Sequence, residues 1–137
     1  MTGILIVTHA NLGSALIETL EFILGGEQKQ LIPISIDIKQ DPDNLRKKIK
    51  KGIAEVQTDN GVLILTDMFG GTPSNISYSF LDEGTVEVIS GVNLPILLKA
   101  VTSREKMEMA QLTAALVEHG KRSISLASDI LKGTKRS

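Results

Sequence analysis

His9 and Asp67 are the two side chains in this sequence whose types and positions best suggest chemistry. Each follows a short apolar segment, residues 4–7 for the histidine and 62–65 for the aspartate. A carboxylate that accepts a hydrogen bond from one imidazole nitrogen sets the tautomer and leaves the other nitrogen free as a nucleophile. That nitrogen could attack phosphorus or an acyl carbon, while the carboxylate stabilises the charge that develops on the ring.

The segments that carry and surround these residues alternate between strand and helix patterns. Residues 4–7 and 62–65 are wholly apolar, which is typical of strands buried on both faces of a parallel sheet. Residues 31–38 alternate with a period of two and include Pro33, which suits an edge strand. A further strand is predicted over 86–89, and helical spacing predicts helices over 14–24, 42–56, 72–81, from 96 to at least 101, and 104–119.

Residues at the ends of the predicted helices support this assignment. Ser14 is a plausible N-cap for the first helix, which Gly25 ends, and Asp41 caps the second helix ahead of a first-turn proline. Gly120 is predicted to stop the long helix, with His119 in its last turn, where a cationic side chain suits the helix dipole. Residues 124–131 fit either a helix or a late strand.

The order of these elements predicts an α/β fold. Strands that alternate with helices favour a doubly wound, mainly parallel sheet with helices on both faces, and we expect the strand order 2-1-3-4. Ligands of such sheets bind beyond the carboxyl ends of the strands, where the strand order reverses. That place lies between the first and third strands, so His9 and Asp67 are predicted neighbours despite their distance in the sequence.

The loop after Asp67 has the features of an anion site. Gly70 and Gly71 allow backbone N–H groups to come close to a ligand, and Thr72 opens a helix whose N-terminus favours negative charge. The hydroxyls of Thr72 and Ser74 add donors. A phosphoryl group on the histidine would find hydrogen bonds there without a cation, and residues 68–69 (Met-Phe) would form an apolar rim suited to a transient partner.

Composition excludes several classes of function. The 137 residues suit one domain, and 15 Lys plus Arg against 16 Asp plus Glu argue against a nucleic-acid binder. The absence of cysteine excludes disulfides, Cys-ligated zinc and iron–sulfur clusters, and two histidines exclude a multi-His metal site within one chain, so we expect no cofactor. No apolar run reaches about 18 residues and the start lacks a signal-peptide pattern, so we expect a cytoplasmic protein.

The basic run over 46–51 is interpreted as a solvated helix face, with a docking surface for an acidic partner as the alternative.

The chain resembles the IIA component of the mannose family of the bacterial phosphoenolpyruvate-dependent sugar phosphotransferase system. The matching segments are 4–9 (ILIVTH), 62–75 (VLILTDMFGGTPSN) and 88–95 (VISGVNLP), and the likeness extends in order over about residues 2 to 130. It implies one IIA domain over 1–130 with a short basic tail over 131–137, as a free-standing IIA. Ala10 departs from the pattern, because many members have glycine after the histidine.

The resemblance also implies roles for particular residues. His9 would be the phosphorylated histidine, Asp67 the acid that orients it, and Thr72 a hydroxyl residue near the phosphoryl group. The protein would be a phosphotransferase that accepts the phosphoryl group from phospho-HPr and passes it to a histidine of a IIB component linked to a membrane permease. Asn93 is assigned, with Met68 and Phe69, to the surface that contacts partners. The resemblance further implies a homodimer, peripheral to a permease complex, in which a C-terminal strand such as 124–126 is exchanged between protomers.

Three other interpretations stay open. The first is a regulatory phosphohistidine module that takes no part in sugar transport. The second is a receiver-like domain phosphorylated on Asp67, although such a domain needs an acidic pair after the first strand to hold magnesium, and Thr8 and His9 stand there. The third is a flavodoxin-like binder of a small ligand, for which residues 8–11 would make a poor phosphate cradle.

Overall fold

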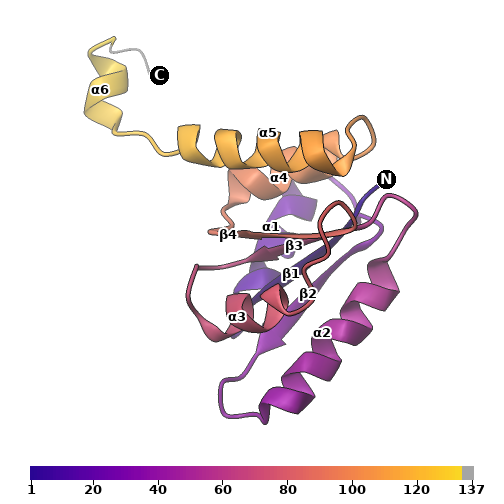
Figure 1. Ribbon diagram of the computed structural model, residues 1–137. Coiled ribbons are helices and arrows are strands. Elements are labelled where there is room, and N and C mark those ends of the chain that lie inside the picture. Colours follow the sequence, from indigo (N-terminus) through magenta and orange to yellow (C-terminus); the bar gives the residue numbers. More distant parts are fainter. Residues whose placement is uncertain (134–137) are drawn as a thin grey trace.

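The sheet has four parallel strands in the order β2-β1-β3-β4 (Figure 1). The computed structural model describes residues 1–133. The strands are β1 (Gly3–His9), β2 (Leu31–Ile36), β3 (Val62–Thr66) and β4 (Val86–Ser90). The predicted fold class and strand order are therefore confirmed, and Pro33 lies on an edge strand, where a missing N–H is tolerated.

The two central strands are apolar because helices cover both of their faces. Ile4 and Ile6 of β1 contribute to the core on one side, and Leu5 and Val7 to the core on the other, with all four fully buried. Alternating side chains of a strand point to opposite faces, so a strand covered twice must be apolar throughout.

The helices divide between these two faces. The first core includes side chains of α1 (Leu12–Leu24), α4 (Leu94–Ser103) and α5 (Met109–Arg122). The second includes side chains of α2 (Pro42–Val56) and α3 (Thr72–Tyr78). A short α6 (Ala127–Leu131) follows α5 and projects away from the sheet (Figure 1). No helix within residues 1–133 is long and apolar enough to cross a membrane.

The first helix begins earlier than predicted. It starts at Leu12, so Ser14 lies inside the first turn and is not its N-cap. The Thr8 hydroxyl accepts a hydrogen bond from the Gly13 amide at 2.9 Å, and a side chain from the preceding strand thus satisfies an amide of the first turn. The predicted caps at Gly25 and Asp41 are confirmed: Gly25 has φ of +80°, and the Asp41 side chain accepts from the backbone of Asp43.

The predicted stop at Gly120 is wrong. The helix runs to Arg122, and Gly120 lies inside it at a packing contact, where a Cβ would lie 2.5 Å from Cδ1 of Ile96 in α4. The predicted start is also wrong, since α5 begins at Met109 and Arg104 is the C-cap of α4. Arg104 is buried and its guanidinium donates to the backbone carbonyls of Thr2, Lys29 and Gln30.

The C-terminal segment forms a helix within this chain. Residues 127–131 are α6, and residues 124–126 belong to no strand of the described chain. Exchange of 124–126 in a dimer therefore stays a prediction. Of the predicted basic tail, residues 134–137 lie outside the described residues.

Candidate functional site

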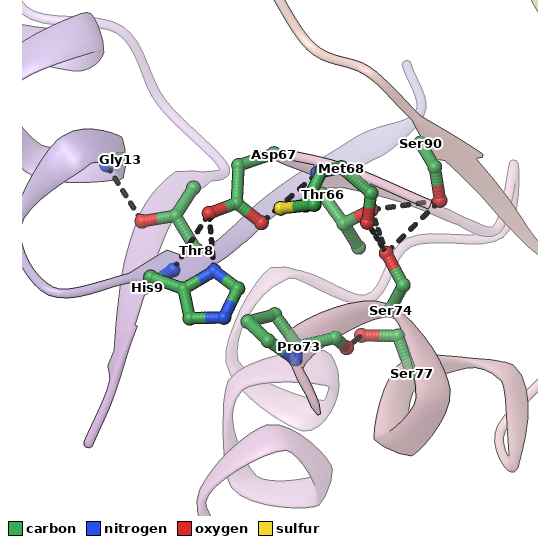
Figure 2. A network of polar contacts seen from close by, with 10 residues as sticks. All are labelled: Thr8, His9, Gly13, Thr66, Asp67, Met68, Pro73, Ser74, Ser77 and Ser90. Carbon is green, nitrogen blue, oxygen red and sulfur yellow. Dashed lines mark hydrogen bonds and ion pairs between the residues drawn. The ribbon is translucent and has the colours of Figure 1, made fainter. Parts of the chain in front are cut away.

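The candidate site lies at the carboxyl edge of the sheet, between β1 and β3. His9 is the last residue of β1, and Asp67 directly follows β3. Because β1 pairs with β2 on one side and with β3 on the other, this edge is the point where the strand order reverses. His9 Nδ1 lies 2.7 Å from Asp67 Oδ2, which confirms the predicted neighbours (Figure 2).

Asp67 is held by hydrogen bonds at both carboxylate oxygens. Oδ2 accepts the His9 amide at 2.9 Å, and Oδ1 accepts the Met68 amide at 3.0 Å. Partial burial acts to raise the pKa of Asp67, but these bonds and the interaction with the His9 ring outweigh it and hold the pKa below its ordinary value of 3.8. The carboxylate is therefore ionised at neutral pH and can only accept.

An ionised Asp67 determines which ring nitrogen of His9 carries the proton. A carboxylate acceptor requires Nδ1 to be the donor, so in the neutral ring Nε2 bears the lone pair. The His9 side chain is 39% exposed, whereas that of Asp67 is only 11% exposed. The site thus leaves the imidazole partly open to solvent and keeps the carboxylate almost covered.

Gly71 lies directly against the imidazole. A Cβ built there would lie 2.9 Å from His9 Cε1 and 3.5 Å from Nε2, so the close approach requires glycine. Gly70 has φ of +85°, a left-handed conformation that glycine adopts without strain. The loop between β3 and α3 therefore lies close to the free nitrogen, where the sequence predicted an anion site.

A hollow of about 470 Å³ opens beside His9 on the side of β2. Sequence reasoning did not assign it, although β2 is the other neighbour of β1 and its carboxyl end must lie at the same edge. Lys48 lines it, with its ammonium group donating to the Ser35 carbonyl at 2.7 Å, so this lysine of the basic α2 face is not simply solvated. The lining residues are His9, Ala10, Asn11, Ser35, Ile36, Asp37, Ile38, Gln40 and Lys48.

The two hydroxyl residues of the predicted anion site differ in position. Thr72 is the first residue of α3 and is partly exposed. Ser74 is fully buried, and its hydroxyl donates to the Met68 carbonyl beneath the loop. The expectation that the Ser74 hydroxyl contacts a phosphoryl group is corrected, because a buried hydroxyl with its proton already donated cannot also donate at the surface.

Comparison with known proteins places this geometry in a family. The EIIA-man family model, described as "PTS system fructose IIA component", matches residues 3–117. This chain belongs to the EIIA-man family. The fructose-specific EIIA component of Bacillus subtilis (strain 168) is 31% identical over 136 residues, which are 98% of this chain and 92% of that protein. The sorbose-specific EIIA component of Lacticaseibacillus casei is 34% identical over 116 residues, or 84% and 83% of the two chains.

Solved structures agree with this membership. The EIIA component from Streptococcus agalactiae superposes with a TM-score of 0.83 at 27% identity, over 93% of this chain and 98% of that one. The predicted resemblance to a mannose-family IIA component is therefore confirmed. As an EIIA-man member, the chain is a IIA component of a sugar phosphotransferase system, and its general role is that of a phosphocarrier.

Ala10 shows how this EIIA-man chain accommodates its departure at the residue after His9. Ala10 has φ of +47°, so it adopts the left-handed conformation that glycine would adopt without strain. Alanine in this conformation carries a steric cost that glycine would not have. The Ala10 amide donates to the Ile36 carbonyl at 3.2 Å, which extends the β1–β2 pairing past His9.

The three residues assigned to partner contact are not equivalent. Met68 and Phe69 are 55% and 79% exposed on the loop, and the Phe69 ring lies 6.1 Å from that of Tyr78 in α3. Asn93 instead caps α4, since its side-chain oxygen accepts the Ile96 amide at 2.8 Å. That role was readable from the sequence, because an asparagine shortly before a first-turn proline is a helix-start pattern.

Proposed function

We propose that His9 carries the phosphoryl group in this phosphocarrier. It would accept the group from the phosphohistidine of HPr and pass it to a histidine of a IIB component. The observation that supports this most directly is the 2.7 Å contact between Nδ1 and Asp67 Oδ2, which leaves Nε2 as the other nitrogen of a ring that is 39% exposed.

The transfer that we propose exchanges one phosphorus–nitrogen bond for another. The Nε2 lone pair attacks phosphorus while the bond to the donor imidazole breaks, and the donor nitrogen keeps the electron pair. The Nδ1 proton stays in its hydrogen bond to Asp67, which stabilises the positive charge of the phosphorylated ring. Both sides of the exchange are phosphoramidates, so placement of the two rings supplies most of the catalysis. The proposal uses no metal or cofactor.

The loop beside the ring supplies the groups that would surround the transferred phosphoryl group. Gly71 lies against the ring, since a Cβ added to it would be 3.5 Å from Nε2. We propose that the backbone N–H groups of Gly70 and Gly71, with the amide and hydroxyl of Thr72, donate to the phosphoryl oxygens. Such donors stabilise an anion without a cation. Met68 and Phe69 would form the apolar contact with each partner in turn.

The partners and location follow from the same proposal. HPr would be the donor and a IIB component, linked to a membrane permease, the acceptor, so we place the protein in the cytoplasm and, when bound, beside the permease. We also propose a homodimer, and we propose no nucleic-acid partner. The relatives are named for fructose and for sorbose, and we assign choice of sugar to the IIB component and permease.

Phosphorylation of Asp67 itself is less well supported. Both of its oxygens already accept hydrogen bonds, from the two backbone amides and the His9 ring. The Asp67 side chain is also only 11% exposed, against 39% for that of His9, so the histidine is the more accessible of the two groups. A regulatory role remains the second candidate, since it would use the same phosphohistidine; reconstitution of sugar uptake with the IIB component and permease would separate transport from regulation.

Phosphorylation with purified components tests the proposal. The protein is incubated with phosphoenolpyruvate, Enzyme I and HPr, its mass is measured, and the modified residue is mapped. We expect the addition of one phosphoryl group on His9, lost in acid and stable in base, whereas an acyl phosphate on Asp67 would be lost in base as well. His9→Ala is the control, and persistent labelling of that variant would contradict the assignment.

A further inference from the structure

Four hydroxyl groups form a network beneath the loop that follows Asp67. It consists of Thr66 at the end of β3, Ser90 at the end of β4, and Ser74 and Tyr78 of α3. The Ser74 oxygen lies 2.6 Å from that of Thr66 and 3.1 Å from that of Ser90, and the Tyr78 hydroxyl lies 2.7 Å from Ser90 (Figure 2 shows the first three residues). The network therefore connects two strand ends and one helix directly below the candidate site.

Ser74 connects this network to the loop. Its hydroxyl has one proton, and because a carbonyl oxygen can only accept, that proton is donated to the Met68 carbonyl. The Ser74 oxygen is then left to accept. Thr66 donates its one proton to the Ser90 hydroxyl at 2.8 Å, so Ser90 is the neighbour that can donate to Ser74. Ser74 is fully buried, and loss of its hydroxyl would take from the Met68 carbonyl the donor that it has beneath the loop.

Met68 is thereby held on both sides of its backbone. Its carbonyl accepts from Ser74, while its amide donates to Asp67 Oδ1 at 3.0 Å. Asp67 in turn contacts Nδ1 of His9 through its other oxygen. A series of three hydrogen bonds thus runs from the buried serine through Met68 and Asp67 to the imidazole, although no hydrogen bond joins Ser74 to the ring itself.

We propose that Ser74 is a positioning residue for phosphoryl transfer through His9. It holds the loop over residues 67–71 in place before the phosphoryl group arrives, so the carboxylate and the loop amides need not reorganise during transfer. This inference rests on the proposed function, and it assigns the serine a different role from the direct contact that its place in the sequence suggested.

Ser77 provides a matched control. It lies in the same helix, is equally buried, and its hydroxyl donates to the Pro73 carbonyl at 2.6 Å. Its hydrogen bond stays within α3 and does not reach the loop. Ser74→Ala and Ser77→Ala therefore each delete one buried hydroxyl from the same helix, and only the first removes support from the Met68 carbonyl.

The experiment measures single-turnover transfer from phospho-HPr to each variant over a range of HPr concentrations. For Ser74→Ala we expect the maximal rate to fall about tenfold or more, because small misplacements of a reacting group are costly, with little change in the HPr concentration that gives half the maximal rate. For Ser77→Ala we expect a rate within about twofold of the unmodified protein, since its bond is remote from the reacting groups. Equal rates for the two variants would overturn the proposal.

A second measurement does not depend on activity. In Ser74→Ala the Met68 carbonyl carbon and the His9 ring nitrogens should change their NMR shifts, whereas Ser77→Ala should leave both unchanged. Unchanged ring shifts in Ser74→Ala would contradict the proposal. If that variant does not fold, Ser74→Cys preserves most of the volume with only a weak donor and serves in the same comparison. Failure to label the unmodified protein would instead refute the proposed function.

Discussion

Oδ2 of Asp67 accepts the backbone amide of His9 at 2.9 Å and faces Nδ1 of the same residue at 2.7 Å. One oxygen therefore restrains both the main chain and the ring of the histidine. The two residues meet because β1 and β3 are adjacent parallel strands whose carboxyl ends lie side by side. The orientation of the imidazole is thus built into the pairing of the sheet.

Asp67→Asn tests this restraint. We expect the fold to be retained and phosphoryl transfer to slow by about 100-fold or more, because the neutral amide no longer stabilises the charged ring and no longer enforces the Nδ1 proton. Circular dichroism checks the fold, and rapid-quench measurement of transfer from phospho-HPr checks the rate. An unchanged rate would remove Asp67 from the mechanism.

The lowered pKa of Asp67 predicts a pH dependence of stability. A carboxyl group with a lower pKa in the folded state contributes stability that is fully present above its unfolded pKa, ordinarily 3.8, and is lost as the pH falls through the folded value. Urea unfolding of the unmodified protein and of Asp67→Asn should therefore show the contribution of the carboxylate in full above that ordinary value. The difference should shrink below the ordinary value, and a difference that grew in acid would contradict the assigned direction.

Gly71→Ala tests the close approach of the loop to the ring. The new Cβ would lie 2.9 Å from His9 Cε1, so the ring or the loop must shift. We expect transfer to slow by about tenfold or more. Gly70→Ala is the matched control: its Cβ would meet open space but its φ is +85°, so it should lose about 1–2 kcal/mol of stability with a smaller effect on transfer. Equal rates in the two variants would contradict the prediction.

Ala10→Gly should stabilise the protein. Relief of the left-handed strain at φ of +47° outweighs the greater entropy that glycine loses on folding, and we expect a net gain of about 0.5–1 kcal/mol. Ala114 lies exposed in the middle of α5, where the same substitution should cost about 0.5–1 kcal/mol. Chemical denaturation gives the change in the free energy of unfolding for each variant, which should be a gain at position 10 and a loss in the helix. A loss of stability at position 10 would show that the residue is unstrained.

The strands, most of the helices and the meeting of His9 with Asp67 could be predicted from the sequence. Apolar periodicity records which face of an element is buried, so residues 4–7 and 62–65 could be recognised as central strands. The rule that parallel strands present their carboxyl ends at one edge then brings the two site residues together. These inferences depend on local patterns and on one general property of doubly wound sheets.

Only the tertiary structure decided which atoms lie opposite one another. Gly120 resembled a helix stop, yet it is the place where Ile96 of α4 packs against α5. Ser74 resembled a surface donor, yet the loop covers it and its proton goes to Met68. Periodicity states that a side chain is buried but not what it contacts, because contacts between elements depend on how the elements pack, and no local pattern records that packing.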